Sequence, residues 1–200
     1  FTNWLAHKTR WDFSDYSSLH QWSIDNLEEF WASLLEYSNV IYSEPYQQVL
    51  NQTKMPGAKW FSGMRMNFAE NVLGKKFEGT AIVFRFEKRS DESEADGSFG
   101  GEYSYAELKR LVARCARGLK QAGVESRDRV AGYVANMPEA IIACLACASI
   151  GATWSSASPD FGLDALCDRF KLVQPKLIFA TTHYRYNGKT FHTDEVVKQL

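Results

Sequence analysis

Three short apolar runs alternate with helix-like segments in the second half of the chain. The runs cover Arg129–Val134, Ala152–Ser156 and Lys176–Ala180, and helix start and stop signals flank each segment between them. Such alternation is typical of a βαβαβ unit, in which parallel strands form a sheet that helices cover. The pattern therefore predicts an α/β fold with a parallel sheet over residues 129–180.

The first of the two connecting helices is predicted to begin near residue 136 and to be buried. Asn136 can cap it, Glu139 follows at the spacing of a capping box, and Pro138 suits a first turn that needs no backbone donor. Residues 140–150 are apolar on nearly every side. Gly151 can then adopt the left-handed conformation that ends a helix.

Periodicity and capping residues predict three further helices. One covers residues 162–174, one begins at Asp25 or the residue after it, and one is opened by Ser104 and Glu107 and ended by Gly123. The last two have apolar stripes made of Leu27, Phe30, Trp31, Leu34 and Leu35, and of Leu108, Leu111, Val112, Cys115, Ala116, Leu119 and Ala122.

A β-hairpin is predicted before the third of these helices. Thr80–Phe86 is rich in β-branched and aromatic residues, and Glu102–Tyr105 can return beside it across a polar loop. The loop carries four acidic residues, Asp91, Glu92, Glu94 and Asp96. They lack the glycine-centred pattern of a calcium loop, so a solvated loop is the preferred interpretation. Residues 1–15 show no periodicity and are expected to pack as an aromatic arm.

Composition narrows the classes of function. The 200 residues are 45% hydrophobic, which suits one or two domains. The net charge of −1 gives no excess of positive charge for binding nucleic acid or an anionic membrane. The longest apolar run, about eleven residues, is too short to span a bilayer. No secretory leader is evident, and four cysteines without a disulfide framework favour a reducing, cytoplasmic location. The sequence leaves the oligomeric state open.

Residue pairs that could carry chemistry have simpler structural explanations. Cys144 and Cys147 form a C-x-x-C in mid-helix, away from the helix start that lowers a thiol pKa, so packing is preferred. Asp164 and Asp168 lie one turn apart near a helix start, where acidic residues are favourable. The cysteines and histidines lack zinc-site spacing, and no dinucleotide, P-loop or nucleophile-elbow motif occurs. We therefore expect no metal site and assign no catalytic residue.

The central stretch contains five characteristic segments: Asp128-Arg129-Val130, Asn136-Met137-Pro138-Glu139, Cys147–Ala152, Trp154–Gly162 and Asp168-Arg169-Phe170. On these segments it resembles the acyl-CoA synthetase branch of the adenylate-forming enzymes, and within it most closely the acetoacetyl-CoA synthetases. Acetyl-CoA synthetases are similar, but they typically read His-Ser-Val where this chain reads Trp154-Ser155-Ser156. The similarity extends from about Asp15 to the end.

The resemblance implies a domain organisation. Residues 1–75 would form a mainly helical amino-terminal cap region, and residues 76–200 would begin the AMP-binding domain with its parallel βαβαβ half. Lys59–Leu73 is similar to the segment that joins these two parts, and Asn67 and Glu70 have the spacing of a reciprocal cap on a short helix. The unfinished helix pattern at Thr193–Leu200 fits an amino-terminal portion of a longer protein.

The resemblance also implies an activity. Such enzymes activate a carboxylate with ATP and Mg²⁺, release pyrophosphate, and pass the acyl group from AMP to coenzyme A. Acetoacetate is the implied acid. The sites for ATP and Mg²⁺ are expected mainly outside these residues. Left open are a ligase for acetate, propionate or another short acid, and a non-catalytic α/β binding module.

One loop is a candidate coenzyme A contact. Arg185, Tyr186, Asn187, Gly188 and Lys189 follow the last strand, and Asn187-Gly188 is a strong turn signal. Open α/β sheets place ligands beyond the carboxyl ends of their strands. In the resembling enzymes a basic-x-Gly-basic loop at the corresponding place contacts coenzyme A. Gly188 and Lys189 match its second half, whereas Tyr186 stands where the first basic residue is expected, with Arg185 as the neighbouring cation.

Overall fold

The computed structural model describes residues 1–74, 77–87 and 100–200. The chain divides into two compact units, Phe1–Asn67 and Phe68–Leu200. The domain boundary expected between residues 75 and 76 lies outside the described residues and stays a prediction. The acidic loop residues Asp91, Glu92, Glu94 and Asp96 also lie outside them.

The first unit contains helices and one small antiparallel sheet. Its elements are α1 (Thr2–Lys8), α2 (Tyr16–Asp25), α3 (Leu27–Tyr37), β1 (Gln48–Leu50) and β2 (Trp60–Ser62). Periodicity located α3 but not α1 or α2, which occupy the segment expected as an irregular arm and the residues after it. The helical character expected of this region is therefore confirmed.

Aromatic packing holds the first helices together. Trp22 of α2 is 5% exposed, and its ring lies near those of Trp11, Phe13 and Phe30. Asp15 caps α2 by accepting a hydrogen bond from the Ser18 backbone, 2.8 Å away. Of the two predicted starts for the next helix, Asn26 is the N-cap residue of α3, whereas Asp25 ends α2.

The second unit begins with a short helix and a hairpin. α4 (Phe68–Leu73) precedes β3 (Thr80–Arg85) and β4 (Gly100–Ser104), which pair antiparallel as predicted. α5 (Tyr105–Gln121) follows directly. Ser104 and Glu107 form the predicted capping box at its start, and Gly123 lies just beyond its end with a positive φ of 81°.

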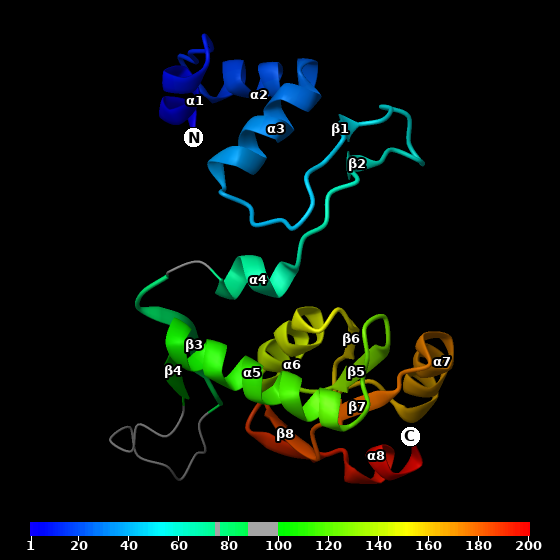
Figure 1. Ribbon diagram of the computed structural model, residues 1–200. Coiled ribbons are helices and arrows are strands. Elements are labelled where there is room, and N and C mark those ends of the chain that lie inside the picture. Colours follow the sequence, from blue (N-terminus) through cyan, green and yellow to red (C-terminus); the bar gives the residue numbers. More distant parts are fainter. Residues whose placement is uncertain (75–76, 88–99) are drawn as a thin grey trace. The chain divides into compact units, whose positions relative to one another are not determined.

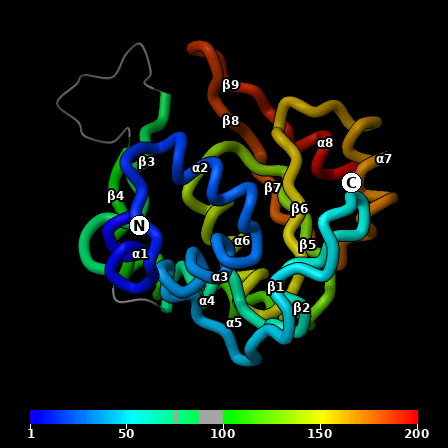
Figure 2. Tube along the Cα trace, turned by 90° about the horizontal axis from the view of Figure 1, so that it is seen from above, coloured from blue at the N-terminus to red at the C-terminus, as the bar shows by residue number. Residues whose placement is uncertain are grey.

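A three-stranded parallel sheet forms the centre of this unit. Its strands and helices follow the chain as β5 (Arg129–Tyr133), α6 (Pro138–Ser149), β6 (Thr153–Ala157), α7 (Leu163–Val173) and β7 (Leu177–Ala180). The strand order is β6-β5-β7, so β5 lies in the middle (Figures 1 and 2). The βαβαβ prediction is confirmed.

The chain then forms a second hairpin and a last helix. β8 (His183–Tyr186) pairs antiparallel with β9 (Lys189–His192), and α8 (Asp194–Gln199) follows. The sequence indicated a turn here but not the two strands that flank it.

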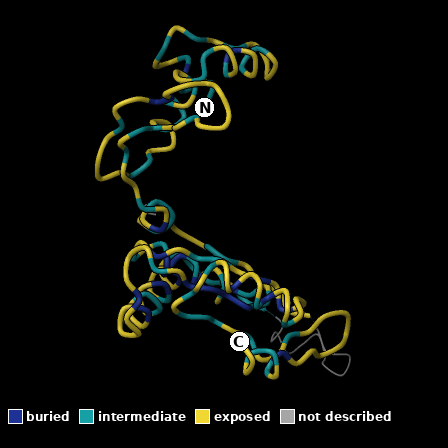
Figure 3. Tube along the Cα trace, turned by 90° about the vertical axis from the view of Figure 1, so that its right-hand side faces the viewer, coloured by how far each residue is buried: buried dark blue, intermediate teal, exposed yellow. Residues whose placement is uncertain are grey.

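Helices cover both faces of the parallel sheet. One buried cluster joins α5 and α6 to one face, on which Val130 lies. A second cluster joins α7 and α8 to the other face, on which Ala131 and Tyr133 lie. Consecutive residues of β5 thus enter opposite layers, and the strand is buried from Val130 onward. Figure 3 shows buried segments in the interior of this unit.

The start of α6 differs from its prediction. Met137, not Asn136, is the N-cap residue, and no side chain caps the helix. The reason is Pro138: it takes the first helical position, and a residue before proline is held in an extended conformation, here with φ of −140°. Asn136 is therefore exposed one residue before the cap. The end of α6 agrees with its prediction, because Gly151 has a φ of 76°.

Candidate functional site

The carboxyl ends of the three parallel strands define the candidate site. The connection after β5 covers one face of the sheet and the connection after β6 covers the other. In open α/β sheets, ligands bind where connections leave in opposite directions. The segments that emerge at this edge are residues 134–137, 158–162 and 181–182, and the last leads into the β8–β9 hairpin.

Tyr133 fixes one of these segments. The side chain is 1% exposed, and its hydroxyl donates to the Pro159 carbonyl oxygen at 2.8 Å, with the Phe161 carbonyl oxygen 3.2 Å away. Burial raises the pKa of this phenol, and Tyr184 and Asp160 raise it further. The hydroxyl therefore remains a neutral donor that holds the 158–161 turn against the end of β5.

Backbone and threonine contacts fix the base of the β8–β9 hairpin. The Thr181 backbone N–H donates to the Tyr133 carbonyl oxygen at 2.9 Å, and that of Thr193 donates to the Thr182 carbonyl oxygen at 2.8 Å. The Thr193 hydroxyl also donates to the Thr181 carbonyl oxygen, and this side chain is 3% exposed. The hairpin is thus attached firmly to the edge of the sheet.

The tip of the hairpin carries the five sequence-predicted residues. Asn187 and Gly188 have positive φ values of 51° and 72°, the signs that a type I′ turn requires at both central positions. Tyr186 and Lys189 close the turn as cross-strand partners, and all five residues are exposed. An exposed, turn-borne cation of this kind can contact an anion.

The two cations near the tip lie on opposite faces of the hairpin. Lys189 pairs with Tyr186, whereas Arg185 pairs with Thr190 one position further from the turn. Since side chains alternate between the faces of a strand, Arg185 does not stand beside Lys189. The stacked rings of Tyr184 and Phe191, 5.2 Å between centroids, lie on the Lys189 face.

Other candidates from the sequence remain structural. Cys147 has no exposed surface, and burial, with Cys115 and Cys144 nearby, raises the pKa of its thiol to about 12. Burial also raises the pKa of Cys144. Asp168 lies 3.8 Å from Lys171 on the same exposed helix face. These groups lack the features of a nucleophile or an acid–base pair.

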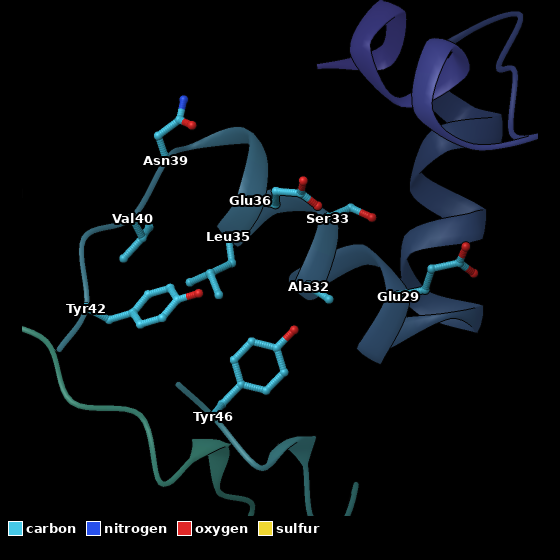
Figure 4. Close-up of a pocket in the computed structure, with 9 residues that line it drawn as sticks. All are labelled: Glu29, Ala32, Ser33, Leu35, Glu36, Asn39, Val40, Tyr42 and Tyr46. Atoms are coloured by element: carbon cyan, nitrogen blue, oxygen red, sulfur yellow. The ribbon is translucent and has the colours of Figure 1, made fainter. Parts of the chain in front are cut away.

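A cavity of about 420 Å³ lies in the first unit, between α3 and the chain after it. In Figure 4 the rings of Tyr42 and Tyr46 face the helix residues Leu35 and Ala32 across it. Both lining carboxylates have partners: Glu29 accepts from the Trp11 indole at 2.8 Å, and Glu36 pairs with Lys8. The cavity contains none of the sequence-predicted site residues.

The described ranges contain neither a metal-binding cluster nor a membrane-spanning helix. No three His, Cys, Asp or Glu side chains in these ranges cluster so as to hold a metal ion. No helix among them is long and apolar enough to cross a membrane.

Sequence reasoning missed the residues that position the hairpin. Tyr133 reads as one more apolar strand residue, and its role depends on a carbonyl group 26 residues later. Thr193 directly precedes the acidic first turn of α8. This place before a helix was the only local feature of the sequence that could have drawn attention to the residue. Their partners are brought near only by the strand order.

Comparisons with known proteins agree with this geometry. The model of the family described as AMP-binding enzyme matches residues 74–199, and the model described as acetyl-coenzyme A synthetase N-terminus matches residues 16–72. The acetoacetyl-CoA synthetase of Xenopus tropicalis is 38% identical over 178 residues, covering 88% of this chain and 25% of that protein. The acetoacetyl-coenzyme A synthetase of Rhizobium meliloti is 36% identical over 200 residues, covering 100% of this chain and 29% of that protein.

A solved structure has the same fold over the whole chain. The acetoacetyl-CoA synthetase from Streptomyces lividans superposes with a TM-score of 0.87 at 36% identity, covering 100% of this chain and 30% of that one. The chain thus spans between a quarter and a third of the length of these relatives. Because the first family model covers well over half of the residues, and the sheet has the arrangement described above, the chain belongs to the family of AMP-binding enzymes.

Proposed function

We propose that the chain is the amino-terminal part of an acetoacetate–CoA ligase. Residues 1–75 are the cap region and residues 76–200 begin the AMP-binding domain. The observation that carries the proposal is the similarity to proteins named acetoacetyl-CoA synthetase over 88–100% of the chain. The Trp154–Gly162 segment supports the same acid, because it differs from the acetyl-CoA synthetase pattern.

The chemistry of the proposed reaction explains its two steps. A free carboxylate is a poor electrophile, so acetoacetate first attacks the α-phosphate of ATP and displaces pyrophosphate. The thiol of coenzyme A then attacks the acyl carbonyl, and AMP leaves. In this proposal ATP and Mg²⁺ are bound mainly by residues beyond this chain. The setting is the cytoplasm.

Exchange of pyrophosphate into ATP tests the first step in the full-length protein. Acetoacetate should support exchange, and acetate should support much less. Equal specificity constants for the two acids would contradict the substrate and favour a general short-chain ligase. If no acid supports exchange, the chain is an α/β binding module without this catalysis.

We further propose that the hairpin tip contacts coenzyme A, with Lys189 at a phosphate of its nucleotide end. The tip is exposed beyond the carboxyl edge of the sheet, and in the described residues Lys189 has no ion pair that would compete for it. Lysine is a mobile point charge suited to an exposed phosphate. Tyr186 shares the face of Lys189, whereas Arg185 lies on the opposite face, so Arg185 does not join Lys189 at the same phosphate.

Substitution of Lys189 tests the contact with coenzyme A independently of the adenylation step. Lys189→Ala should raise KM for coenzyme A about five- to thirtyfold, which corresponds to about 1–2 kcal/mol for a charge-assisted contact, and leave acid-dependent exchange nearly intact. The penalty should be larger for coenzyme A than for dephospho-coenzyme A if the 3′-phosphate is the partner.

A matched lysine provides the control. Lys198→Ala removes an exposed lysine of α8 that pairs with Glu195, and it should leave both KM values unchanged. Equal penalties for coenzyme A and its dephosphorylated form would move the contact to another phosphate. No penalty with either would leave Lys189 a surface residue, without affecting the ligase assignment.

A further inference from the structure

Two histidines lie opposite each other near the open end of the β8–β9 hairpin. His183 of β8 and His192 of β9 are cross-strand partners, with ring centroids 6.4 Å apart. The neighbouring pair, Thr182 and Thr193, is joined by a backbone hydrogen bond of 2.8 Å. Since hydrogen-bonded and non-hydrogen-bonded pairs alternate in an antiparallel ladder, the histidines occupy a non-hydrogen-bonded position, where side chains approach most closely.

Both rings are free to take a ligand. The two side chains are exposed, so neither is a packing residue of the core. The Nδ1 atom of His183 lies 3.3 Å from the Thr182 hydroxyl oxygen. In the tautomer that donates from Nδ1 to this oxygen, Nε2 keeps its lone pair. In a metal-binding histidine, the ring nitrogen that does not bind the metal usually donates a hydrogen bond to a neighbouring group.

We propose that His183 and His192 form a two-ligand site for a first-row transition-metal dication such as Ni²⁺, Cu²⁺ or Zn²⁺. Neutral imidazole nitrogens suit these ions, whereas Mg²⁺ and Ca²⁺ prefer oxygen ligands. No described group of three or more potential ligands includes the pair, so water completes the coordination. Arg185 lies on the same hairpin face two residues from His183, and its charge weakens the site without blocking it.

A bound ion would join the two strands at the end farthest from the turn. The turn pair Tyr186 and Lys189 already closes the other end. Metal binding therefore restricts the hairpin from both ends, and it does so whether or not the tip contacts coenzyme A. The site is separate from the magnesium chemistry of the proposed ligase, because its ligands are nitrogen atoms.

Equilibrium dialysis of the full-length protein with Ni²⁺ tests the site. The variant that combines His183→Gln with His192→Gln should bind one Ni²⁺ fewer per chain than the parent. Each single variant should weaken that site by about tenfold or more, since even outer-shell partners contribute about that much. The cysteines are the same in every variant, so thiol binding does not affect the difference.

The other two histidines of the chain provide the controls. His7→Gln and His20→Gln remove exposed histidines on α1 and α2, and both variants should bind as the parent does. Hydrogen exchange adds a local measurement: Ni²⁺ should slow exchange of the amides of residues 183–192 in the parent and not in the double variant. Unchanged Ni²⁺ stoichiometry and affinity in the double variant, or equal losses in the His7 and His20 variants, would overturn the proposal.

Discussion

Gly132 shows how one missing side chain shapes the central sheet. A Cβ atom added at this position of β5 would lie 2.5 Å from Cη2 of Trp154 on β6. The indole lies across the glycine and reaches Phe179 of β7, with ring centroids 5.9 Å apart. The position of the Trp154 side chain, which belongs to the Trp154–Gly162 segment, thus depends on a glycine 22 residues earlier.

Gly132→Ala should lower the free energy of unfolding by about 1–3 kcal/mol, because the indole must move in a packed layer. Chemical denaturation measures the change. Gly118→Ala is the matched control on α5: no atom lies within 4 Å of its added Cβ, so the substitution should stabilise by about 0.5–1 kcal/mol. A neutral Gly132→Ala would mean that Trp154 moves away at no cost. In a Trp154→Leu background, which lacks the ring atom that the new Cβ would meet, Gly132→Ala should cost much less.

At the residue scale, the sequence predicted which residues occupy turns and helix ends better than it predicted which residues contact each other. The glycines at 123 and 151 and the Asn187-Gly188 turn could be located because their backbone requirements are local. The cap assigned to Asn136 was wrong because Pro138 determines the helix start more strongly than an asparagine two residues earlier. The roles of Tyr133 and Thr193 depend on residues that only the fold brings near.

Two residues predicted as caps, of which only Ser104 forms one, give a test at the scale of the element. Ser104→Ala should lower the free energy of unfolding by about 1 kcal/mol, because Ser104 accepts from the Glu107 backbone and Glu107 accepts from the Ser104 backbone in return. Asn136→Ala should change it by less than about 0.5 kcal/mol, as for an ordinary surface site. Thermal melting of the two variants compares them directly.

The opposite order of these effects would contradict the assignment of the helix starts. Loss of coenzyme A affinity in Asn136→Ala without a change in melting would instead make this exposed side chain a ligand contact. The residue emerges at the carboxyl edge of the sheet, so the substitution distinguishes the two roles.

Elements were predictable where one local pattern determined them. β3, the three parallel strands, α5 and α7 followed from apolar runs, capping boxes and proline positions. β1, β2, β8 and β9 are three or four residues long and, unlike the equally short β7, are not continuous apolar runs. The apolar residues of α1 and α2 are placed by aromatic contacts rather than by a regular stripe.

At the scale of the molecule, residues 1–200 alone should show no ligase activity. The sequence contains no Gly/Ser/Thr-rich phosphate loop, and it spans 25–30% of the relatives' length. Neither acetoacetate-dependent exchange nor thioester formation should exceed the background of a buffer control, and the full-length protein assayed in parallel provides the positive control. Turnover by a preparation shown to be free of other synthetases would place a complete nucleotide site in this chain.

The central position of β5 has a consequence for synthesis on the ribosome. Its contacts with β7 span about twice as many residues as its contacts with β6. One edge of β5 can therefore pair with β6 before β7 has been synthesised to pair with the other edge. During that interval an apolar strand presents unpaired backbone groups, which are a template for pairing with another nascent chain. The time that translation needs to cross α7 therefore sets how long this chain is vulnerable to co-translational aggregation.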